Sequence, residues 1–505
     1  MDEHAETVAI IADQVRQFHE RNIPFRIYHG STSSTRPPHT RRDPTVDTSK
    51  LSNVMKVDPV AKTILVEPNV PMDGLVAATL QHGLVPAVVM EFPGITAGGG
   101  FSGTSGESSS FKYGFFEDTV QWIEMVLANG EIVNASSSEN SDLFQAAGSS
   151  CGTLGVTTLL EIQLLEAKTY VELTYHPISS MAEAVHKIEH ATETKSCHYL
   201  DGIMFAKDKG VICTGRLADT VQEGIQIQRF TRAQDPWFYC HAEKIVNSYS
   251  GSVTEAIPLV DYLFRYDRGT FWGGRYAFKY FLAPFNRITR FLLDRFMHTR
   301  VMYHALHKSG LAKRYMVQDV GVPIHAAEEF LEFLDHNYRM YPLWLCPLQL
   351  TARAKASPYH SNTKADMLLN FGVWGPGPAD LDGFVDANRR LEQKVLELDG
   401  LKALYAHTYY TEEEFWEIYD KRKYNAIRAK FHAEYLPTIY DKAKVDVDGE
   451  KKALKESWRV WLLDWIWSIW PLMGLYGVLY VLLSGKVVIP QGRELVRKGG
   501  VKKKD

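Results

Sequence analysis

The sequence has few cysteines and no cysteine spacing that would hold a metal ion or build a disulfide framework. Among its 505 residues are five cysteines: Cys151, Cys197, Cys213, Cys240 and Cys346. No CxxC pair occurs, and an odd number of scattered cysteines argues against a disulfide framework. We therefore expect reduced thiols on the cytosolic side of a membrane and no metal site.

A charge excess and a signal peptide are also missing. The formal net charge is -4 at pH 7, which gives no reason to expect a nucleic-acid partner. Residues 1–22 carry acids and helix-spaced apolar residues in place of a continuous apolar run, so nothing there directs secretion. A chain of this length with 45% hydrophobic residues is expected to fold as two or three packed units.

Long apolar runs are scarce, and one without any charged residue lies near the C-terminal end, at residues 465–483. Its length approaches the ~20 residues that cross a bilayer core. Tryptophans crowd its start, as aromatic residues do at a membrane interface: Trp458, Trp461, Trp465, Trp467 and Trp470. We expect residues 458–489 to associate with a membrane, with a buried helix as the alternative. A re-entrant hairpin bent at Pro471, Gly474 and Gly477 would keep both flanks in the cytosol.

Glycine and serine are concentrated in residues 97–114, AGGGFSGTSGESSSFKYG. Gly98, Gly100 and Gly103 have the GxGxxG spacing of a dinucleotide fold, which also requires a preceding strand and a following helix. Here the next residues are too rich in serine and glycine for a stable helix, and a hairpin signal follows at Asn129-Gly130. The pattern excludes a Rossmann site. It predicts a loop whose backbone N–H groups approach an anionic ligand closely.

Two more small-residue segments, 30–35 and 149–157, flank this loop within an α+β region of short strands at residues 1–170. We expect a helix at 1–22, two strands joined at Asp58-Pro59, a helix that ends at Gly83, and a hairpin at 119–135. Three such segments in one unit predict a single long ligand lying between them.

These segments resemble the flavin-binding domain of the vanillyl-alcohol oxidase type, and the likeness narrows to the 24-dehydrocholesterol reductase (Diminuto) family. It is carried by GITAGGGFSGTSGESSSFKYGFF (94–116), SENSDLF (138–144) and SSCGTLG (149–155). Further similar segments are 236–243, 317–323, 341–347, 413–420 and 436–442. The resemblance therefore spans most of the chain.

The resemblance implies an extended FAD that is not tethered covalently, although His29 precedes the first loop. The FAD-binding residues it implies are Gly30, Ser31, Thr32, Ser33, Ser34, Thr35, Gly98, Gly99, Gly100, Ser102, Gly103, Thr104, Gly106, Glu107, Ser108, Asp118, Gly152, Gly155, Val156 and Thr157. It also implies NADPH as electron donor and a sterol as substrate.

An α+β organisation in several units follows from the resemblance. It consists of an FAD-binding domain at 1–170, a cap domain with an aromatic substrate pocket at 171–404, and helices returning to the flavin domain at 405–442. A charged linker (443–457), the membrane segment (458–489) and a basic tail (490–505) complete it. Within the cap we expect strands near 170–178, 202–217 and 341–350, and after it a helix capped by Thr411 and Glu414.

The activity that the resemblance implies is reduction of the Δ24 side-chain double bond of a sterol, which needs a hydride and a proton. Our preferred proton donors are Tyr409, Tyr410, Lys112 and Glu107, and further candidates are Tyr113, Asp319 and His407.

Two alternatives stay open at this point. One is an FAD-dependent oxidase or isomerase of another isoprenoid lipid, and the other is a lipid-binding protein without chemistry, against which the intact glycine set argues. For location, NADPH, reduced thiols and the terminal sequence Lys502-Lys503-Lys504-Asp505, similar to a dilysine retrieval signal, predict the endoplasmic reticulum membrane with a cytosolic catalytic domain.

Overall fold

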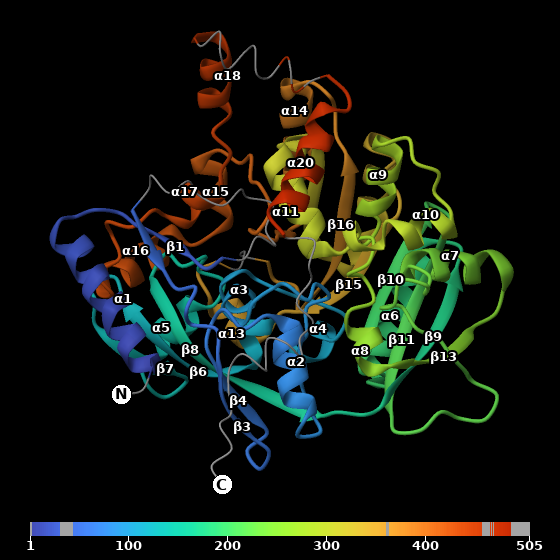
Figure 1. Cartoon of the computed structure of the whole chain (residues 1–505), viewed down its shortest axis with the longest axis horizontal. Helices are drawn as coiled ribbons and strands as arrows, with labels where there is room; N and C mark the ends of the chain where they lie inside the picture. Colours follow the sequence, from blue (N-terminus) through green and yellow to red (C-terminus); the bar gives the residue numbers. More distant parts are fainter. Residues whose placement is uncertain are drawn as a thin grey trace.

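Two large β-sheets, each with helices packed against it, lie side by side in Figure 1. The computed structural model describes residues 3–30, 44–359, 363–456, 465, 467 and 469–485. Residues 3–166, here called the N-terminal part, contain the first sheet, and residues 170–402, the middle part, contain the second. The fold is therefore a mixed α/β fold, in agreement with the α+β expectation.

The sheet of the N-terminal part has six strands, all paired antiparallel. In sheet order they are β3 (Val54–Asp58), β4 (Thr63–Val66), β8 (Gly155–Glu166), β6 (Val120–Leu127) and β7 (Ile132–Ser136), with β5 (Leu84–Pro86) also paired to β8. A separate parallel pair is β1 (Arg26–Tyr28) and β2 (Thr45–Asp47). The expected hairpins at Asp58-Pro59 and Asn129-Gly130 are confirmed, and Gly130 has the positive φ of 88° that such turns favour.

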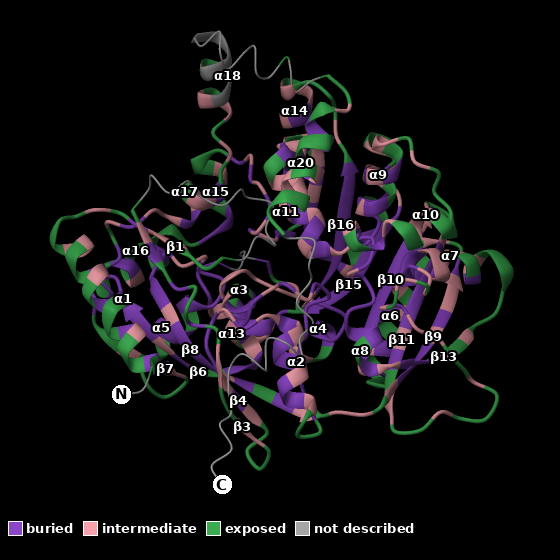
Figure 2. Cartoon of the chain, viewed as in Figure 1, coloured by how far each residue is buried: buried purple, intermediate pink, exposed green. Residues whose placement is uncertain are grey.

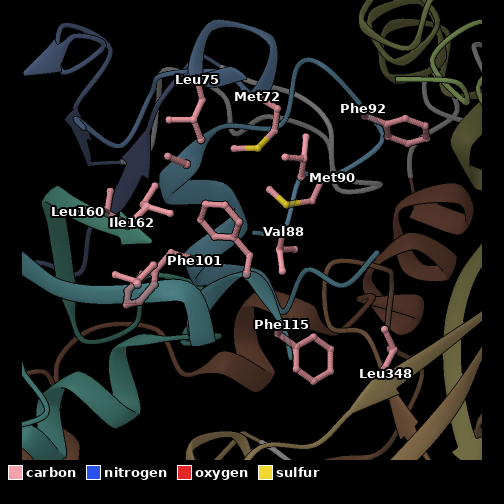
Figure 3. Close-up of a cluster of buried hydrophobic side chains, with 14 of the residues drawn as sticks. Met72, Leu75, Val88, Met90, Phe92, Phe101, Phe115, Leu160, Ile162 and Leu348 are labelled. Atoms are coloured by element: carbon pink, nitrogen blue, oxygen red, sulfur yellow. The ribbon is translucent and has the colours of Figure 1, made fainter. Parts of the chain in front are cut away.

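Helices cover this sheet because their apolar residues recur on one face. The helices are α1 (Glu3–Glu20), α2 (Met72–Leu80), α3 (Ala97–Ser102), α4 (Ser110–Tyr113) and α5 (Ser141–Ala147), with the 3-10 turn η1 (Phe116–Thr119). In α1, Val8, Ile11, Ala12 and Val15 are buried. Figure 3 shows the core beneath α2 and α3, which includes Met72, Leu75, Met90, Phe101 and Phe115.

The glycine-rich segment contains two short helices, so the expectation of an uninterrupted loop is wrong for residues 97–102 (α3) and 110–113 (α4). Thr96 caps α3, its Oγ1 accepting the Gly99 N–H at 3.1 Å. A Cβ on Gly98 would lie 2.6 Å from Pro68 Cβ, so the helix packs closer than a side chain allows. The cap and this packing offset the low helix propensity of glycine. The exclusion of a Rossmann site still holds, because the strands that follow are antiparallel.

The sheet of the middle part has nine strands, and its strands include those expected from the sequence near 170–178, 202–217 and 341–350. In sheet order they are β12 (Gln226–Ile227), β13 (Val253–Pro258), β9 (Tyr170–Ile178), β11 (Lys209–Ala218), β10 (Tyr199–Ala206), β15 (Leu343–Gln349), β16 (Met367–Pro376), β14 (Tyr315–Pro323) and β17 (Leu401–Lys402). All neighbours are antiparallel except β12 and β13.

The two faces of this sheet are covered differently. On one face α6 (Met181–Thr194), α12 (Ala327–Asn337) and α14 (Leu381–Glu397) form a hydrophobic core of their own with the sheet. The other face shares one continuous core with the N-terminal part. Helices on or beside that face are α7 (Phe238–Ser248), α8 (Leu259–Leu263), α9 (Gly273–Tyr280), α10 (Arg287–Leu292), α11 (Thr299–Ser309) and α13 (Ala352–Ala356), with the 3-10 turns η2 (Asp294–Phe296) and η3 (Leu311–Arg314). The turn η4 (Ile324–Ala326) belongs to the first face, because Ala326 lies in the core of α6, α12 and α14. The space between the two parts therefore lies against this shared core.

Helices after the second sheet lead back to the N-terminal part. They are α15 (Glu412–Ile418), α16 (Lys421–Lys430), α17 (Ile439–Ala443) and α18 (Val447–Glu456), the last within the stretch expected as a charged linker. The expected capping box of Thr411 and Glu414 at α15 is confirmed. Tyr435 donates its hydroxyl to the Ala128 carbonyl at 2.7 Å. These contacts bring the C-terminal helices to the edge of the first sheet.

The expected membrane segment is only partly within the described residues. Its described helix is α20 (Leu472–Leu483), whose residues Met473, Gly474, Gly477 and Val481 are buried and which packs on α11. Among the residues that the structure describes, no helix has both the length and the apolar character needed to cross a membrane. Residues 457–464 and 486–505, which include the basic tail, lie outside the described residues.

Candidate functional site

A cavity of about 1000 Å³ lies between the N-terminal and middle parts, and both parts line it. Many residues expected from the sequence are on its wall: Gly30, Gly98, Gly99, Ser102, Gly103, Thr104, Gly106, Gly152, Gly155, Val156 and Thr157. Described residues from all three small-residue segments, Gly30 alone from the first, therefore line one cavity, as a single long ligand requires. Ser31, Thr32, Ser33, Ser34 and Thr35 lie outside the described residues.

Four of the expected FAD-binding residues are not on the cavity wall. Gly100 faces Met90 and Phe116 in the core below α3. The Glu107 carboxylate accepts the Ser108 hydroxyl at 2.8 Å, and the Ser108 carbonyl accepts the Leu200 N–H at 2.7 Å.

Asp118, the fourth, accepts the Thr351 hydroxyl at 2.7 Å and the Phe115 N–H at 2.9 Å. Burial, together with the neighbouring charge of Glu117, raises the pKa of Asp118 to about 6. Since Leu200 and Thr351 belong to the middle part, Ser108 and Asp118 connect the two parts in this structure.

Other wall residues were not expected from the sequence. The N-terminal part contributes residues 26–29, 45–48 in part, 68–69, 90–92 and 95–96, and the C-terminal helices contribute Lys442. The Lys442 ammonium donates to the carbonyls of Cys151 and Gly152 at 2.8 and 3.0 Å. These wall residues could have been found from their positions in the sequence. Residues 90–96 directly precede the glycine segment, and Lys442 is the last residue of segment 436–442, one of those that resemble the reductase family.

The backbone of the glycine segment forms an anion cradle that fits FAD. Thr104, Ser105 and Gly106 all line the cavity, and their N–H groups have no acceptor among the described residues. Consecutive free N–H groups bind phosphates and other anionic oxygens. The fit extends to the Lys442 charge at the wall beside Gly152. These residues therefore suit a long, doubly charged dinucleotide ligand.

A buried carboxyl group lies on the same wall. Glu91 is 6% exposed, and its Oε1 has no hydrogen-bond partner among the described residues. Burial, with the nearby charge of Glu107, raises its pKa well above the usual value. A buried carboxyl oxygen without a partner on this wall is a second feature of the site that the protein itself leaves unsatisfied.

Behind Glu91 a buried ion pair occupies the core. Arg265, 1% exposed, donates to Asp201 at 2.7 Å, and the Tyr266 hydroxyl and Trp344 Nε1 donate to the same carboxylate at 2.9 and 3.1 Å. One guanidinium thus balances Asp201 and leaves Glu91 and Glu107 without a cation of their own. The pKa of both glutamates is raised, mainly by burial.

On the side of the middle part, an aspartate lies on the wall. Asp319 of β14 accepts the Asn370 amide N–H at 3.0 Å and the Tyr405 hydroxyl, and all three residues line the cavity. Burial raises the pKa of Asp319 to about 6, against the lowering effect of these hydrogen bonds. A carboxyl group with a pKa near neutrality is suited to proton transfer.

The four preferred proton donors are not on the cavity wall. The Tyr410 hydroxyl donates to the Glu392 carbonyl at 3.4 Å, and the Tyr409 N–H donates to the Glu392 carboxylate at 3.0 Å. Lys112 is exposed, 5.4 Å from the ring centre of Tyr113, and Glu107 is buried behind the glycine segment. Of the wider set of candidates, Asp319 is the one that the structure brings to the cavity.

Aromatic rings surround the part of the cavity next to Asp319. Phe271 lies at the centre of this group, 4.4 Å from the Trp374 ring, 5.2 Å from the Trp344 ring and 5.6 Å from the Phe92 ring. Tyr303 of α11 completes it, 6.1 Å from Phe92. This end of the cavity is therefore an aromatic compartment that suits an apolar ligand.

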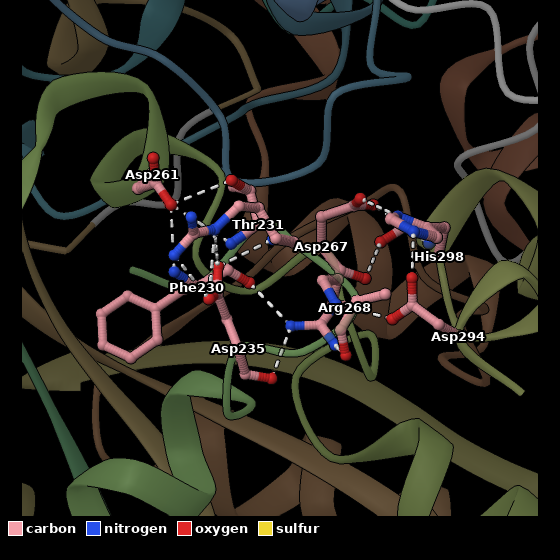
Figure 4. A network of polar contacts seen from close by, with 11 residues as sticks. Phe230, Thr231, Asp235, Asp261, Asp267, Arg268, Asp294 and His298 are labelled. Carbon is pink, nitrogen blue, oxygen red and sulfur yellow. Dashed lines mark hydrogen bonds and ion pairs between the residues drawn. The ribbon is translucent and has the colours of Figure 1, made fainter. Parts of the chain in front are cut away.

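A polar network fixes the segment that carries Phe271 and leads into α11 (Figure 4). His298 contacts Asp267 at 2.6 Å and Asp294 at 3.5 Å, and Arg268 donates to Asp294 at 2.7 Å. Burial lowers the pKa of His298, but the two carboxylates more than offset this and raise it to about 9. His298 is therefore a cation at neutral pH.

Comparisons with known proteins agree with this geometry. A family model described as an FAD binding domain matches residues 4–136. The Delta(24)-sterol reductases of Macaca fascicularis and Homo sapiens are 30% identical over 87% of this chain and 86% of their own length. The Arabidopsis thaliana Delta(24)-sterol reductase is 30% identical over 81% of this chain and 78% of its own.

The cradle, the aromatic compartment and these matches define an FAD-binding oxidoreductase. More narrowly, the chain belongs to the Delta(24)-sterol reductase family. The resemblance found in the sequence is thereby confirmed.

Proposed function

We propose that the protein reduces the Δ24 side-chain double bond of a sterol, using FAD and NADPH. The observation that carries the proposal is the continuity of the cavity, which joins the backbone cradle of the glycine segment to an aromatic compartment with Asp319 on its wall. The relatives named Delta(24)-sterol reductase support the substrate class. An oxidase or isomerase of another isoprenoid is the alternative that the experiment below addresses.

FAD would be held by the N-terminal part and by Lys442. The N–H groups of Thr104, Ser105 and Gly106 would bind its phosphate or ring oxygens, and Lys442 would supply a positive charge on the same wall as Glu91. When bound, FAD supplies hydride chemistry, with NADPH as the source of electrons. The other expected binding residues, Ser31–Thr35 among them, remain part of this proposal.

Asp319 and Tyr405 would deliver the proton. Both residues line the cavity and are joined by a hydrogen bond, so protonated Asp319 would supply the proton while Tyr405 holds its carboxyl group in place. Asn370 holds the other carboxyl oxygen of Asp319 and so fixes the orientation of the pair. Proton transfer from a positioned acid contributes roughly 10²- to 10⁴-fold to a rate.

The aromatic compartment would stabilise positive charge on the alkene and exclude water. Protonation of one alkene carbon leaves positive charge on its more substituted neighbour, and the faces of Phe271, Trp344 and Trp374 attract a cation. The same rings bind the apolar side chain of a sterol and hold it near Asp319.

A sterol dissolves in bilayers, which supports a location at the endoplasmic reticulum membrane with the cavity on the cytosolic side, where NADPH is available. We also propose the expected units: an FAD-binding domain at 1–170, a cap at 171–404 and returning helices at 405–442.

The test is turnover of a Δ24 sterol by the purified full chain with NADPH, followed by mass spectrometry of the product. The proposal predicts a product two mass units heavier, no reaction of the side-chain-saturated sterol, and no requirement for O2. Sterol consumption that needs O2, or a product of unchanged mass, would instead identify an oxidase or an isomerase.

A further inference from the structure

Exposed apolar side chains gather at two neighbouring places on the surface, here together called the apolar face. The first is the segment after α9 and through α10, with Leu282, Phe285, Ile288, Phe291 and Leu292; the second is the outer side of α20, with Leu472, Leu475, Tyr476, Leu479, Leu482 and Leu483. Ile288 and Leu292 are 71% and 70% exposed. Figure 2 shows exposed residues along both α10 and α20.

Helix α10 gives nothing to the protein core. None of its residues Arg287–Leu292 is buried, although half of them are apolar. The helix is nevertheless capped, with Asn286 Oδ1 accepting the N–H groups of Ile288 and Thr289 at 2.9 and 3.1 Å. A formed helix that holds three large apolar side chains in water indicates a contact surface.

The two segments adjoin, so that they form one surface. The Trp470 Nε1 donates to the Tyr280 carbonyl at 2.6 Å, where α9 ends, and the Gly474 N–H donates to the Tyr280 hydroxyl at 3.2 Å. The exposed segment 282–292 begins two residues later. The first turn of α20 is therefore fixed beside the start of the apolar α10 segment.

Positive charge accompanies the apolar face. Arg275, Lys279, Arg287 and Arg295 are exposed and make no ion pair with a carboxylate of the described residues. The one acid between residues 273 and 298 is Asp294, which already contacts Arg268 and His298. A surface with exposed Leu, Ile and Phe side chains and unpaired cations is complementary to a bilayer that contains anionic lipids.

Helix α20 of the apolar face also lines the cavity, together with α11. Tyr480 of α20 and Tyr303 and Lys308 of α11 line it, and the Lys308 ammonium lies 5.0 Å from the centre of the Tyr480 ring. Since one side of α20 is exposed and apolar and another lines the cavity, this helix separates the cavity from whatever covers the apolar face.

We propose that the apolar face docks the protein on the surface of a bilayer containing anionic lipids, and that the substrate passes from the bilayer into the cavity past α20. The docking does not need a spanning helix. The passage of substrate rests on the proposed function; the docking does not.

Binding to vesicles tests the docking. The full chain is mixed with phosphatidylcholine vesicles or with vesicles that also contain phosphatidylserine, and the bound fraction is measured by flotation. We expect stronger binding to the anionic vesicles, and a more than tenfold loss of that binding for the double variant Ile288→Asp, Leu292→Asp. Arg287→Glu with Arg295→Glu should remove most of the dependence on phosphatidylserine.

The matched control is Val60→Asp with Ile227→Asp. These residues are 94% and 53% exposed and belong to the β3–β4 turn and to β12, outside the two segments of the apolar face. The control should bind vesicles as the unchanged protein does. Vesicle binding by the Ile288→Asp, Leu292→Asp variant at the unchanged level would overturn the proposal. So would a dimer of the unchanged protein that this variant dissociates, since the face would then bind a second copy.

Delivery of the sterol separates the docking from the proposed function. The Ile288→Asp, Leu292→Asp variant should lose turnover of sterol held in anionic vesicles and keep turnover of sterol carried by cyclodextrin. Equal losses with both carriers would contradict a role in access from the bilayer. If neither the unchanged protein nor any variant turns over a sterol, the proposed function is wrong. The docking proposal is then still tested by the difference in vesicle binding alone.

Discussion

The two walls of the cavity are built from different parts of the polypeptide. Residues 98–106 and 152–157 of the N-terminal part line the cavity with glycines and small hydroxyl residues, here called the backbone wall. Asp319 of β14 and the aromatic rings form what is here called the side-chain wall; these rings come from β15, β16, the segment before α9, α11 and, with Phe92, the N-terminal part. A backbone wall binds any ligand with anionic oxygens, whereas a side-chain wall selects shape and supplies a proton. The proposed function would therefore place cofactor binding and substrate chemistry on separate walls.

The largest effect is expected from a variant that disrupts only the backbone wall. In Gly103→Val, the new Cβ would lie 2.7 Å from the Gly99 carbonyl oxygen, so the end of α3 must move and the cradle at Thr104–Gly106 with it. We expect complete loss of bound flavin, measured as the ratio of visible to protein absorbance. Gly251→Val, where nothing lies within 4 Å of the added Cβ, should keep its flavin. A yellow, active Gly103→Val protein would contradict the assignment of this wall.

The second-largest effect is expected from a variant that changes only the side-chain wall. Asp319→Asn removes the proposed proton donor while it keeps the shape of the side chain, so kcat should fall roughly 10²- to 10⁴-fold with the flavin content unchanged. Because Asp319 acts in its protonated form and its pKa is about 6, the rate of the unchanged enzyme should decline as pH rises above that value.

The decline of kcat with pH should be absent in Asp319→Asn and shifted in Tyr405→Phe. Stopped-flow reoxidation of the reduced flavin by sterol measures this step directly. An unchanged pH profile in Asp319→Asn would assign the proton to another group, and the sequence candidates Tyr409 and Tyr410 would be tested next.

The third prediction concerns the network that supports the aromatic compartment. The pKa of His298 is raised to about 9 from 6.5, so its stabilising effect is fully present below pH 6.5 and is lost as pH rises through 9. The free energy of unfolding should therefore fall by about 3 kcal/mol between pH 6.5 and 10 relative to His298→Gln. Urea denaturation of both proteins across this range provides the measurement. Parallel pH curves for the two proteins would refute the charged state of His298.

The smallest effect on stability is expected for a contact that joins the N-terminal part to the middle part. Arg300 of α11 donates both terminal nitrogens to Asp73 of α2, at 2.9 and 2.8 Å, and one of them to the Pro93 carbonyl at 2.9 Å. Arg300→Gln leaves this half-buried carboxylate unpaired and should cost about 1–3 kcal/mol in thermal or urea unfolding. The exposed pair of Lys62 and Glu166 is the control, and Lys62→Gln should change stability little.

The backbone wall was largely predictable from the sequence, because a cluster of glycine and serine is visible within one short stretch of the chain. Eleven of the expected binding residues line the cavity, from Gly30 to Thr157. The helix at 97–102 was missed because its stability comes from contact with Pro68 and from the Thr96 cap, and not from the propensity of its glycines.

The side-chain wall was not predictable in the same way. Its aromatic residues lie far apart in the sequence, and each one alone is typical of an ordinary hydrophobic core: Phe92, Phe271, Trp344 and Trp374. Asp319 was one of seven sequence candidates, but its place in an apolar strand did not single it out, and only the pairing of β14 with β16 brings it beside Asn370. Glu91 was missed, because no sequence pattern marks it as a buried residue of the cavity wall.

The proposed function requires electrons to pass from an FAD bound at the backbone wall to a sterol held by the side-chain wall. The most direct measurement is the visible absorbance of the flavin in the purified full chain under anaerobic conditions, first with NADPH and then with a Δ24 sterol. We predict bleaching by NADPH and recovery of the absorbance only when the unsaturated sterol is added. A bleached flavin that the sterol does not reoxidise, or a flavin that NADPH does not bleach, would contradict the account.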